Sequence, residues 1–496
     1  MMMQKISRII KKSSVKLFIC GIGGIGTSGL SLLAKSCGYQ VCGSNEEENS
    51  NTEKLKKLGI DVKIKHKAEN VRGNDIFVYT NAIDLSTNIE AIEAKALQMP
   101  MYDRGKMLAM LMKNYFNIVI AGSHGKTTTT GLIGNMLNKI GKKPNVLIGG
   151  VLNDSKTNCE IGKKYFVVES DESDGSFLGM PANIGVITNI DPEHMEFYKT
   201  IENLEYYFYR FAKKIVDNNG NIIVCIDDKV GKDLVKKLEK ELNNKKNNNK
   251  KTKNKVKQVI TYSAVNKKAD FYCSNIKYRK DGIVFDVFNN INKTSEKNVF
   301  LSNMYGEINA SNATTVFAVG YILNQNSGKI AKTFSQFAGI QKRFTICGEC
   351  QKTLIVDDYA HNPQKIHSAI GSAKHYMKCN NLKGKLTIVF EPHRYTRVRD
   401  SIDLFADILK EADNVLVLPI YASSEQQIEG ITQDFVVKKC KKHNKNVFSC
   451  ELDVKKIKSK LKEIKAFEKD NLIVFMGAGR SSKLAHQIVE KSLNDK

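Results

Sequence analysis

The segment GSHGKT at residues 122–127 combines the residue types that bind phosphate groups. It lies between the apolar, strand-like run NIVIA and the helical pattern TTTGLIGNML. In such a strand–loop–helix unit the backbone amides can hold phosphate oxygens, Lys126 can neutralise the β- and γ-phosphates of a nucleotide, and the hydroxyl of Thr127 can bind Mg²⁺. Ile120 stands where the full phosphate-loop motif has its first glycine, and a glycine turn with a chance lysine is the alternative. We expect nucleotide contacts from Gly122, Ser123, His124, Gly125, Lys126, Thr127 and Thr128, with His124 shaping the loop.

Acidic residues follow two strand-like runs later in the chain. The run YFVVES contains Glu169, with Asp171, Glu172 and Asp174 after it, and the run GVITNI leads to Asp191, Glu193 and His194. The carboxyl ends of parallel strands form the edge at which α/β sheets bind ligands, and Mg²⁺ prefers oxygen ligands. We therefore expect these acids beside the phosphate loop. The alternative for any one of them is a solvated turn residue.

A second glycine-rich loop, GIGGIG, follows the first strand-like run of the chain. Gly21, Gly23 and Gly26 match the pattern G-x-G-x-x-G, which lets backbone amides approach a diphosphate at a helix N-terminus. A dinucleotide site adds an acidic residue about twenty residues further on, whereas Ser44 and Asn45 end the next strand-like run here. This difference counts against NAD. A nicotinamide-dependent dehydrogenase is one alternative, and glycines that serve only close helix–strand packing are another.

Strand-like and helix-like segments alternate along the whole chain, which is typical of parallel α/β sheets. A length of 496 residues, at about 150 residues per domain, suggests three domains. We expect the domains to cover residues 1–113, 114–336 and 337–496, with TLIVDD, KLTIVF, NVLVLPI and NLIVFMG as strands of the last one. The Lys/Asn-rich stretch 243–255 is expected to lengthen a surface loop of the second domain.

Charge and cysteine usage bear on the class of partner and on location. The net charge is +25, but residues 236–257 and 438–465 carry 16 of it, almost entirely as lysine. Nucleic-acid recognition favours arginine, so we expect no nucleic-acid partner, with a basic binding protein as the alternative. The 11 cysteines include no pair of C-x-x-C motifs, which favours reduced thiols. No apolar run approaches the roughly 18 residues that cross a bilayer. We expect a cytoplasmic protein without a membrane partner.

Nine segments, in one order, resemble the Mur ligase family: GIGGIG, GSHGKTTTT, ESDESD, TNIDPEH, NASNA, QKRF, VDDYAHNP, EPHRYTRVRD and GAGR. The likeness covers nearly the whole chain. It implies an N-terminal Rossmann-like UDP-binding domain, a central P-loop ATPase domain and a C-terminal Rossmann-like domain. Within the family the segments are most similar to the members that add alanine.

The resemblance also implies roles for individual residues. Lys126 and Thr127 would hold ATP and Mg²⁺, Glu169 would bind magnesium, and His194 would bind a second magnesium. Further ATP contacts would come from Asn309, Asn312 and Arg343. Sugar-nucleotide and amino-acid contacts would come from Gly21, Gly23, Gly24, Gly26, Ser44, Tyr359, His361, Arg394 and Arg397, and the catalytic set would be Lys126, His194, His361, Arg394 and Arg397. Asn45, Glu193 and Ile308 depart from the family's Asp, Asp and His, and Lys213 is not expected to be the carbamylated lysine of other members.

The activity implied by the resemblance is ATP-dependent amide bond formation. The lactyl carboxylate of UDP-N-acetylmuramate would accept the γ-phosphoryl group of ATP, and the amine of L-alanine would attack the acyl phosphate, with Arg394 and Arg397 stabilising the oxyanion. The alternative within the family is a recycling ligase that adds a tripeptide. The expected partners are small-molecule substrates, and the chain is expected to be a monomer or a homodimer.

Overall fold

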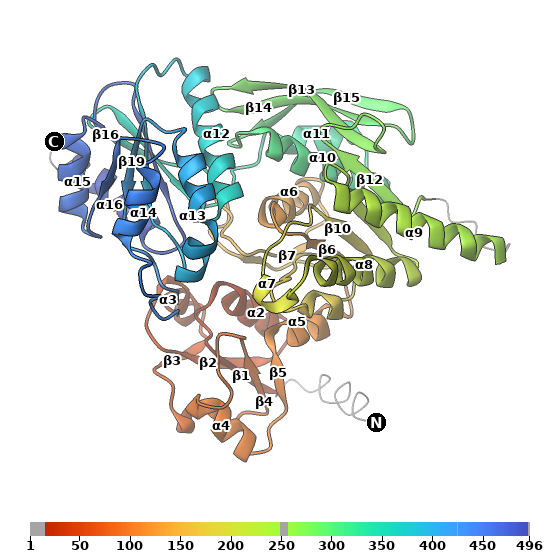
Figure 1. Ribbon diagram of the computed structural model, residues 1–496. Helices are drawn as coiled ribbons and strands as arrows, with labels where there is room; N and C mark the ends of the chain where they lie inside the picture. The colour runs from red at the N-terminus through yellow and green to blue at the C-terminus, as the bar shows by residue number, and fades with distance from the viewer. Residues whose placement is uncertain (1–14, 249–255, 424, 495–496) are drawn as a thin grey trace. The chain divides into compact units, whose positions relative to one another are not determined.

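The computed structural model describes residues 15–248, 256–423 and 425–494, which form a mixed α/β structure with three sheets (Figure 1). Contacts divide the chain into two compact units. One unit comprises residues 1–274, 286–299 and 311–337, and the other comprises residues 275–285, 300–310 and 338–496.

The first sheet has five parallel strands in the order β3-β2-β1-β4-β5. β1 (Lys16–Cys20) is apolar and central, and the glycine loop joins it to α2 (Ile25–Ser36), whose Leu30, Leu33 and Ala34 are fully buried. The remaining elements are β2 (Gln40–Asn45), α3 (Ser50–Lys57), β3 (Asp61–Ile64), η1 (Ala68–Val71), β4 (Ile76–Tyr79), α4 (Ile89–Ala96), β5 (Met101–Asp103) and α5 (Arg104–Met112).

The second sheet contains ten strands in the order β15-β14-β13-β12-β11-β10-β6-β9-β7-β8. Its central strand β6 (Phe116–Ala121) runs parallel to β9 (Tyr165–Glu169) on one side and to β10 (Ile184–Ile187) on the other. The carboxyl ends of these three strands therefore meet at one edge, as expected. The other strands are β7 (Asn145–Leu147), β8 (Cys159–Glu160), β11 (Asn221–Cys225), β12 (Val259–Ser263), β13 (Phe271–Arg279), β14 (Gly282–Asn289) and β15 (Thr294–Ser302).

Hydrophobic periodicity is clear in one of the helices that follow these strands. In α8 (Ile201–Asp217) the residues Leu204, Phe208, Phe211 and Ile215 recur on one face and are buried. The other helices of this part are α6 (Lys126–Lys139), η2 (Ser176–Gly179), α7 (Met195–Tyr198), α9 (Lys229–Asn248), α10 (Glu307–Ile322) and α11 (Ser327–Phe334).

The third sheet has the order β16-β17-β21-β18-β19-β20, and only the pair β16–β17 is antiparallel. Val474 packs in the hydrophobic core on one face of this sheet, whereas Ile473 and Phe475 pack in the core on the other. Helices thus cover both faces. The elements are β16 (Thr345–Cys350), β17 (Thr353–Asp358), α12 (Pro363–Cys379), β18 (Leu386–Phe390), α13 (Tyr395–Leu409), β19 (Asn414–Val417), α14 (Gln433–Cys440), β20 (Val447–Ser449), α15 (Val454–Glu463), β21 (Leu472–Met476) and α16 (Ser481–Asn494).

Two features differ from the sequence analysis. The strands β13, β14 and β15 were not anticipated, because polar and charged residues interrupt their apolar residues. The stretch 243–255 was expected to be a loop, but α9 continues to Asn248. The part of α9 before residue 243 is rich in lysine, glutamate and leucine, which favour helix, and no proline follows, so the helix continues into the stretch. Residues 249–255 of that stretch lie outside the described part of the chain.

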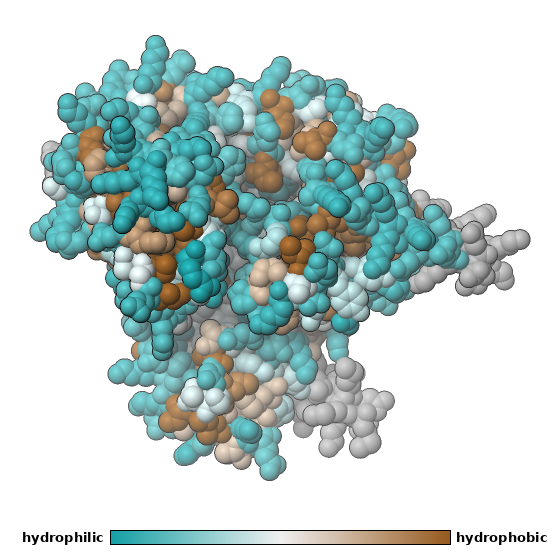
Figure 2. All heavy atoms as spheres, in the orientation of Figure 1, coloured by the Kyte–Doolittle hydropathy of each residue, from teal (hydrophilic) through white to brown (hydrophobic). Residues whose placement is uncertain are grey.

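The face drawn in Figure 2 is mostly hydrophilic, with hydrophobic side chains in scattered patches. In the portion of the chain that the structure describes, no helix has the length and apolar character needed to cross a membrane. The cysteines are all free thiols, including Cys347 and Cys350, which form a single C-x-x-C motif on β16.

Candidate functional site

Two glycines with positive φ shape the loop between β6 and α6. Gly122 has φ +131°, and a Cβ atom there would lie 2.1 Å from Oγ1 of Thr188. Gly125 has φ +80°, and its Cβ would lie 2.7 Å from Oδ1 of Asn312. Both positions therefore require glycine. The loop leads directly into the N-terminus of α6, where free backbone amides and the helix dipole favour an anion.

Lys126 is the first residue of α6 and its ammonium group is held over the loop. Nζ donates to the carbonyl oxygen of Gly122 at 2.5 Å and lies 2.7 Å from Oε1 of Glu172. Although burial acts in the opposite direction, the carboxylates of Glu172 and Glu169 raise the pKa of Lys126 above its ordinary value. The site therefore presents a positive charge where a phosphate would lie.

Thr127 and Glu169 form the oxygen-rich part of the site. The Thr127 hydroxyl donates to Oε1 of Glu169 at 2.9 Å, and the Gly149 N–H donates to Oε2 at 2.7 Å. A threonine hydroxyl beside a fixed carboxylate matches the ligands that Mg²⁺ uses at nucleotide sites.

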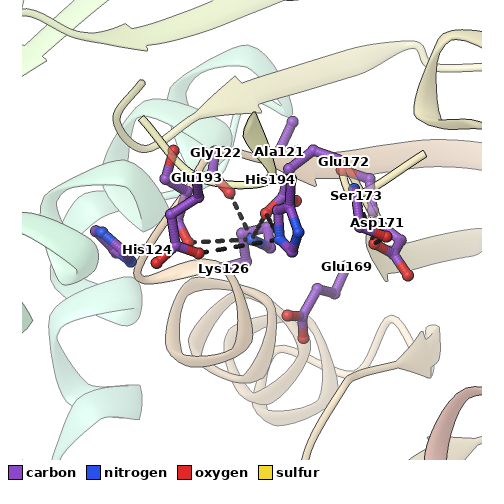
Figure 3. Close-up of polar contacts among 12 residues, drawn as sticks. Ala121, Gly122, His124, Lys126, Glu169, Asp171, Glu172, Ser173, Glu193 and His194 are labelled. Atoms are coloured by element: carbon purple, nitrogen blue, oxygen red, sulfur yellow. Dashed lines mark hydrogen bonds and ion pairs between the residues drawn. The ribbon is translucent and has the colours of Figure 1, made fainter. Parts of the chain in front are cut away.

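Glu172 and His194 also lie near Lys126, and Figure 3 shows them together with Glu193. His194 has φ +56°, precedes α7, and places Nε2 3.8 Å from Oε1 of Glu172 and 3.9 Å from Oε2 of Glu193. Burial raises the pKa of Glu172. Within the described chain no hydrogen-bond donor reaches Oε2 of Glu172, a buried atom. A cation near Glu172 and His194 would satisfy that oxygen.

The remaining loop residues hold the backbone in place. The Ser123 hydroxyl donates to the Asp191 carbonyl oxygen, and the carbonyl oxygen of His124 accepts from Thr188 and Asn189. Nε2 of the His124 ring lies 3.6 Å from Oδ2 of Asp191. Thr128 is buried. These contacts fit His124 as a residue that shapes the loop.

The two predicted asparagines occupy successive turns of α10. Asn312 is buried and accepts a hydrogen bond from Thr129 at 3.3 Å, so it lies against the start of α6. Asn309 donates to the carbonyl oxygen of Tyr305 at 2.6 Å. The division of the chain assigns Asn309 to one unit and Asn312 to the other.

The glycine loop after β1 is held by polar side chains of the next loop. Gly21 has φ +74° and accepts a hydrogen bond from the N–H of Gly24 at 3.2 Å. The N–H of Gly23 donates to Oδ1 of Asn45 at 3.1 Å. Asn45 therefore supports the loop as a neutral acceptor. Ser44, which precedes Asn45 on β2, is buried.

Arg104 was missed by the sequence analysis. A Cβ atom on Gly26 would lie 2.9 Å from Nη1 of Arg104, and Nη2 donates to Oδ2 of Asp171 at 2.6 Å. This arginine links the glycine loop to an acid that follows β9, and only the packing of distant segments reveals it.

A cluster of rings forms in the C-terminal unit. The rings of Tyr359 and His361 lie 4.8 Å apart, those of His361 and His393 5.1 Å apart, and Nη1 of Arg397 lies 2.9 Å from Nδ1 of His393. Burial and Arg397 lower the pKa of His393 to about 4, and burial also lowers that of His361. Both imidazoles are therefore neutral at physiological pH. The structure brings together three residues predicted for substrate binding.

Arg394 and Arg343 each lie beside a carboxylate. Arg394 has φ +67°, and its Nε donates to Oε1 of Glu425 at 2.6 Å. The guanidinium of Arg343 lies 5.8 Å from the centre of the Tyr359 ring. Burial raises the pKa of Asp358 to about 6, although Arg343 acts in the opposite direction. Glu172, His393 and Asp358 were quoted in motifs but were not selected, because their proximity to functional residues depends on the fold.

Lys213 belongs neither to the residues around Lys126 nor to the ring cluster of the C-terminal unit. Its Nζ forms ion pairs of 3.1 Å with both Asp217 and Glu241 on the half-buried side of α8 and α9.

Comparison with known proteins agrees with this architecture. The chain matches the Mur ligase family catalytic domain over residues 17–116, the Mur ligase middle domain over residues 120–320, and the Mur ligase glutamate ligase domain over residues 342–479. It is 36% identical over 487 residues to the UDP-N-acetylmuramate–L-alanine ligase of Pelagibacter ubique (strain HTCC1062), covering 97% of this chain and 99% of that protein.

A second relative of the same name, from Bradyrhizobium sp. (strain ORS 278), is 35% identical over 477 residues, covering 94% of this chain and 96% of that protein. Among solved structures, UDP-N-acetylmuramate-alanine ligase MurC from Thermotoga maritima superposes with a TM-score of 0.78 at 25% identity, covering 97% of this chain and 100% of that chain. A murein peptide ligase from Psychrobacter arcticus shares the fold, with a TM-score of 0.68 at 22% identity, covering 97% of this chain and 99% of that chain. The chain belongs to the Mur ligase family and has its three-domain α/β fold.

Proposed function

We propose that this chain joins L-alanine to the lactyl carboxylate of UDP-N-acetylmuramate at the expense of ATP. The observation that carries the proposal is likeness over the full length: relatives named UDP-N-acetylmuramate–L-alanine ligase match 94% to 97% of the chain at 35% to 36% identity. The phosphate loop and the acids around Lys126 supply the chemistry that such a reaction needs. A dehydrogenase or a basic binding protein would leave this loop without a role.

The residues around the loop fit ATP and magnesium. Gly122 and Gly125 adopt the positive φ of a tight loop that leads into the N-terminus of α6, and Oε2 of Glu172 is buried without a donor in the described structure. Thr127, Glu169 and His194 are proposed to hold Mg²⁺, which when bound neutralises charge on the phosphates. Asn309, Asn312 and Arg343 are proposed as further ATP contacts.

The reaction starts from an unreactive carboxylate. Transfer of the γ-phosphoryl group from ATP converts it to an acyl phosphate and releases ADP, with Lys126 neutralising charge on the transferred group. The amine of L-alanine then attacks the carbonyl carbon, and the tetrahedral oxyanion collapses to an amide with release of phosphate. Arg394 and Arg397 are proposed to stabilise that oxyanion. His361 and Tyr359 are proposed to orient the substrates.

The amino half of the chain is proposed to bind the sugar nucleotide. Gly21, Gly23, Gly24 and Gly26 would offer backbone amides to the UDP diphosphate, with Ser44 at the end of the adjacent strand. We also propose domain boundaries near residues 113 and 336, small molecules as the only substrates, and a cytoplasmic location.

An isotope experiment tests the proposal. With ¹⁸O in the lactyl carboxylate, one labelled oxygen should appear in the phosphate released, and release should require UDP-N-acetylmuramate, ATP, Mg²⁺ and L-alanine together. Unlabelled phosphate would refute the acyl phosphate. Equal turnover with a tripeptide in place of L-alanine would identify a recycling ligase instead.

A further inference from the structure

Four side chains that the proposed reaction does not use as a group meet at the carboxyl ends of strands of the N-terminal sheet. Cys20 ends β1, Ser44 lies near the end of β2, His66 follows β3, and Glu90 lies in the first turn of α4. Cys20, Ser44 and Glu90 are fully buried, and the side chain of His66 is only 15% exposed. A buried carboxylate with a thiol and an imidazole beside it is costly unless these groups satisfy one another.

The carboxylate of Glu90 is held so that its two oxygens have different surroundings. Oε1 accepts from the Lys67 N–H at 3.2 Å and from Nδ2 of Asn70 at 2.7 Å. Oε2 lies 3.2 Å from Sγ of Cys20 and 2.7 Å from Nδ1 of His66. Supporting donors thus orient one oxygen and aim the other at sulfur and nitrogen, which is the arrangement that outer hydrogen bonds give to metal-binding carboxylates.

We propose that Cys20, His66 and Glu90 form a binding site for a thiophilic divalent cation of the zinc type. Their three ligand atoms lie within 4.8 Å of one another. Tetrahedral zinc, with bonds of about 2.0–2.3 Å, separates such ligand atoms by roughly 3.3–3.6 Å. Sγ of Cys20 lies 3.7 Å from Nδ1 of His66 and 3.2 Å from Oε2 of Glu90, so only the 2.7 Å separation between His66 and Glu90 must widen appreciably.

Charge and ligand type select the cation. A thiolate and a carboxylate together neutralise a dication. With the imidazole of His66 neutral, the buried site therefore carries no net charge when the cation is bound. Sulfur and nitrogen ligands favour Zn²⁺ or Co²⁺ over Mg²⁺, which prefers oxygen. Because the cation binds the thiolate, it must displace the thiol proton of Cys20, so its affinity should increase with pH.

Filling the site would affect the adjacent substrate loop, a consequence that rests on the proposed function. The Ser44 hydroxyl donates to Oε2 of Glu90 at 2.5 Å and lies 2.9 Å from Nδ1 of His66, the two atoms that the cation would take. Cys20 directly precedes Gly21. Ser44 would therefore lose its partners, and the cation and the sugar nucleotide should oppose each other's binding.

Cobalt reports thiolate ligation directly, because Co²⁺ bound to sulfur gives a near-ultraviolet charge-transfer band. The full-length protein, freed of metal, is titrated with Co²⁺ and separately with Zn²⁺. The test variant is Cys20→Ser, which keeps the size of the side chain. The matched control is Cys42→Ser, because Cys42 lies on β2 of the same sheet and donates to Asn74 instead. The residues proposed for magnesium include no thiol and cannot produce the band.

We expect the band in the wild-type protein and in Cys42→Ser, and we expect Cys20→Ser to lose one equivalent of Zn²⁺ together with the matching part of the band. A wild-type protein without the band, or a Cys20→Ser variant that binds as much metal as the wild type, would overturn the site. In turnover assays Zn²⁺ should raise the KM for the sugar nucleotide in the wild type but not in Cys20→Ser. An inactive protein would refute the proposed function while the spectra still decided the site.

Discussion

Replacing Lys126 by methionine should separate the catalytic role of this residue from its role in stability. Its Nζ lies 2.7 Å from Oε1 of Glu172, and the two side chains are only 12% and 5% exposed. Removal of one partner of a buried ion pair costs about 3–5 kcal/mol, because the other charge remains buried and unpaired. We expect Lys126→Met to lose turnover and to unfold at a clearly lower urea concentration than the wild type.

The loss of stability should depend on pH. Burial already raises the pKa of Glu172, and Lys126 opposes that shift. Without Lys126 the folded protein binds the Glu172 proton more tightly than the unfolded chain does, so stability is retained in acid and declines as pH increases. The difference between Lys126→Met and the wild type should therefore be larger at about pH 8 than at about pH 5.

A double variant completes the experiment. Lys126→Met combined with Glu172→Gln removes both charges, so it should recover most of the lost stability without regaining turnover. Urea unfolding followed by fluorescence measures stability, and phosphate release measures turnover. If Lys126→Met were as stable as the wild type at about pH 8, the ion pair of Lys126 and Glu172 would not contribute to stability. Restored turnover in the double variant would show that Lys126 has no part in the chemistry.

Four further predictions follow from the same structure. Glu169→Gln should raise the Mg²⁺ concentration needed for turnover and weaken Mn²⁺ binding in the presence of ADP, as measured by electron paramagnetic resonance; unchanged metal binding would remove Glu169 from the site. Gly122→Ala should raise the KM for ATP by at least tenfold, because its Cβ would lie 2.1 Å from Oγ1 of Thr188; normal ATP kinetics would contradict the loop geometry. Burial raises the pKa of Asp358 to about 6, so this group lowers unfolding free energy as pH rises from about 4 to 6, and Asp358→Asn should flatten that part of the stability profile. Deleting residues 249–255 should leave turnover unchanged, because their Lys/Asn-rich composition is typical of solvated segments.

Local signals explain why much of the fold could be predicted. The phosphate loop was recognisable because strand, glycines, lysine and helix follow one another in the sequence, and the glycines have positive φ as such a turn requires. The strands β17, β18, β19 and β21 were recognisable as apolar runs of the right length. By contrast, polar and charged residues interrupt the apolar residues of β13 to β15, so their sheet pairing was not evident.

Contacts between distant segments account for what sequence reasoning missed. Glu172 was one of several acids after β9, and only its 2.7 Å approach to Lys126 distinguishes it. Arg104 and Glu90 each lie far along the chain from the residues that they contact, so no motif joins them to the glycine loop or to Cys20.

The amino-acid sequence by itself determined the family, the order of the three α/β domains and the phosphate-binding character of GSHGKT, because each depends on residue types at short separations along the chain. Tertiary structure decided which carboxylate pairs with Lys126, which carboxylate accepts from Thr127, and that a thiol, an imidazole and a carboxylate meet next to the first glycine loop. Those pairings depend on the register and packing of strands and helices that are tens of residues apart. Residue type alone does not reveal them, because the properties of a carboxylate change only when the fold buries it away from water.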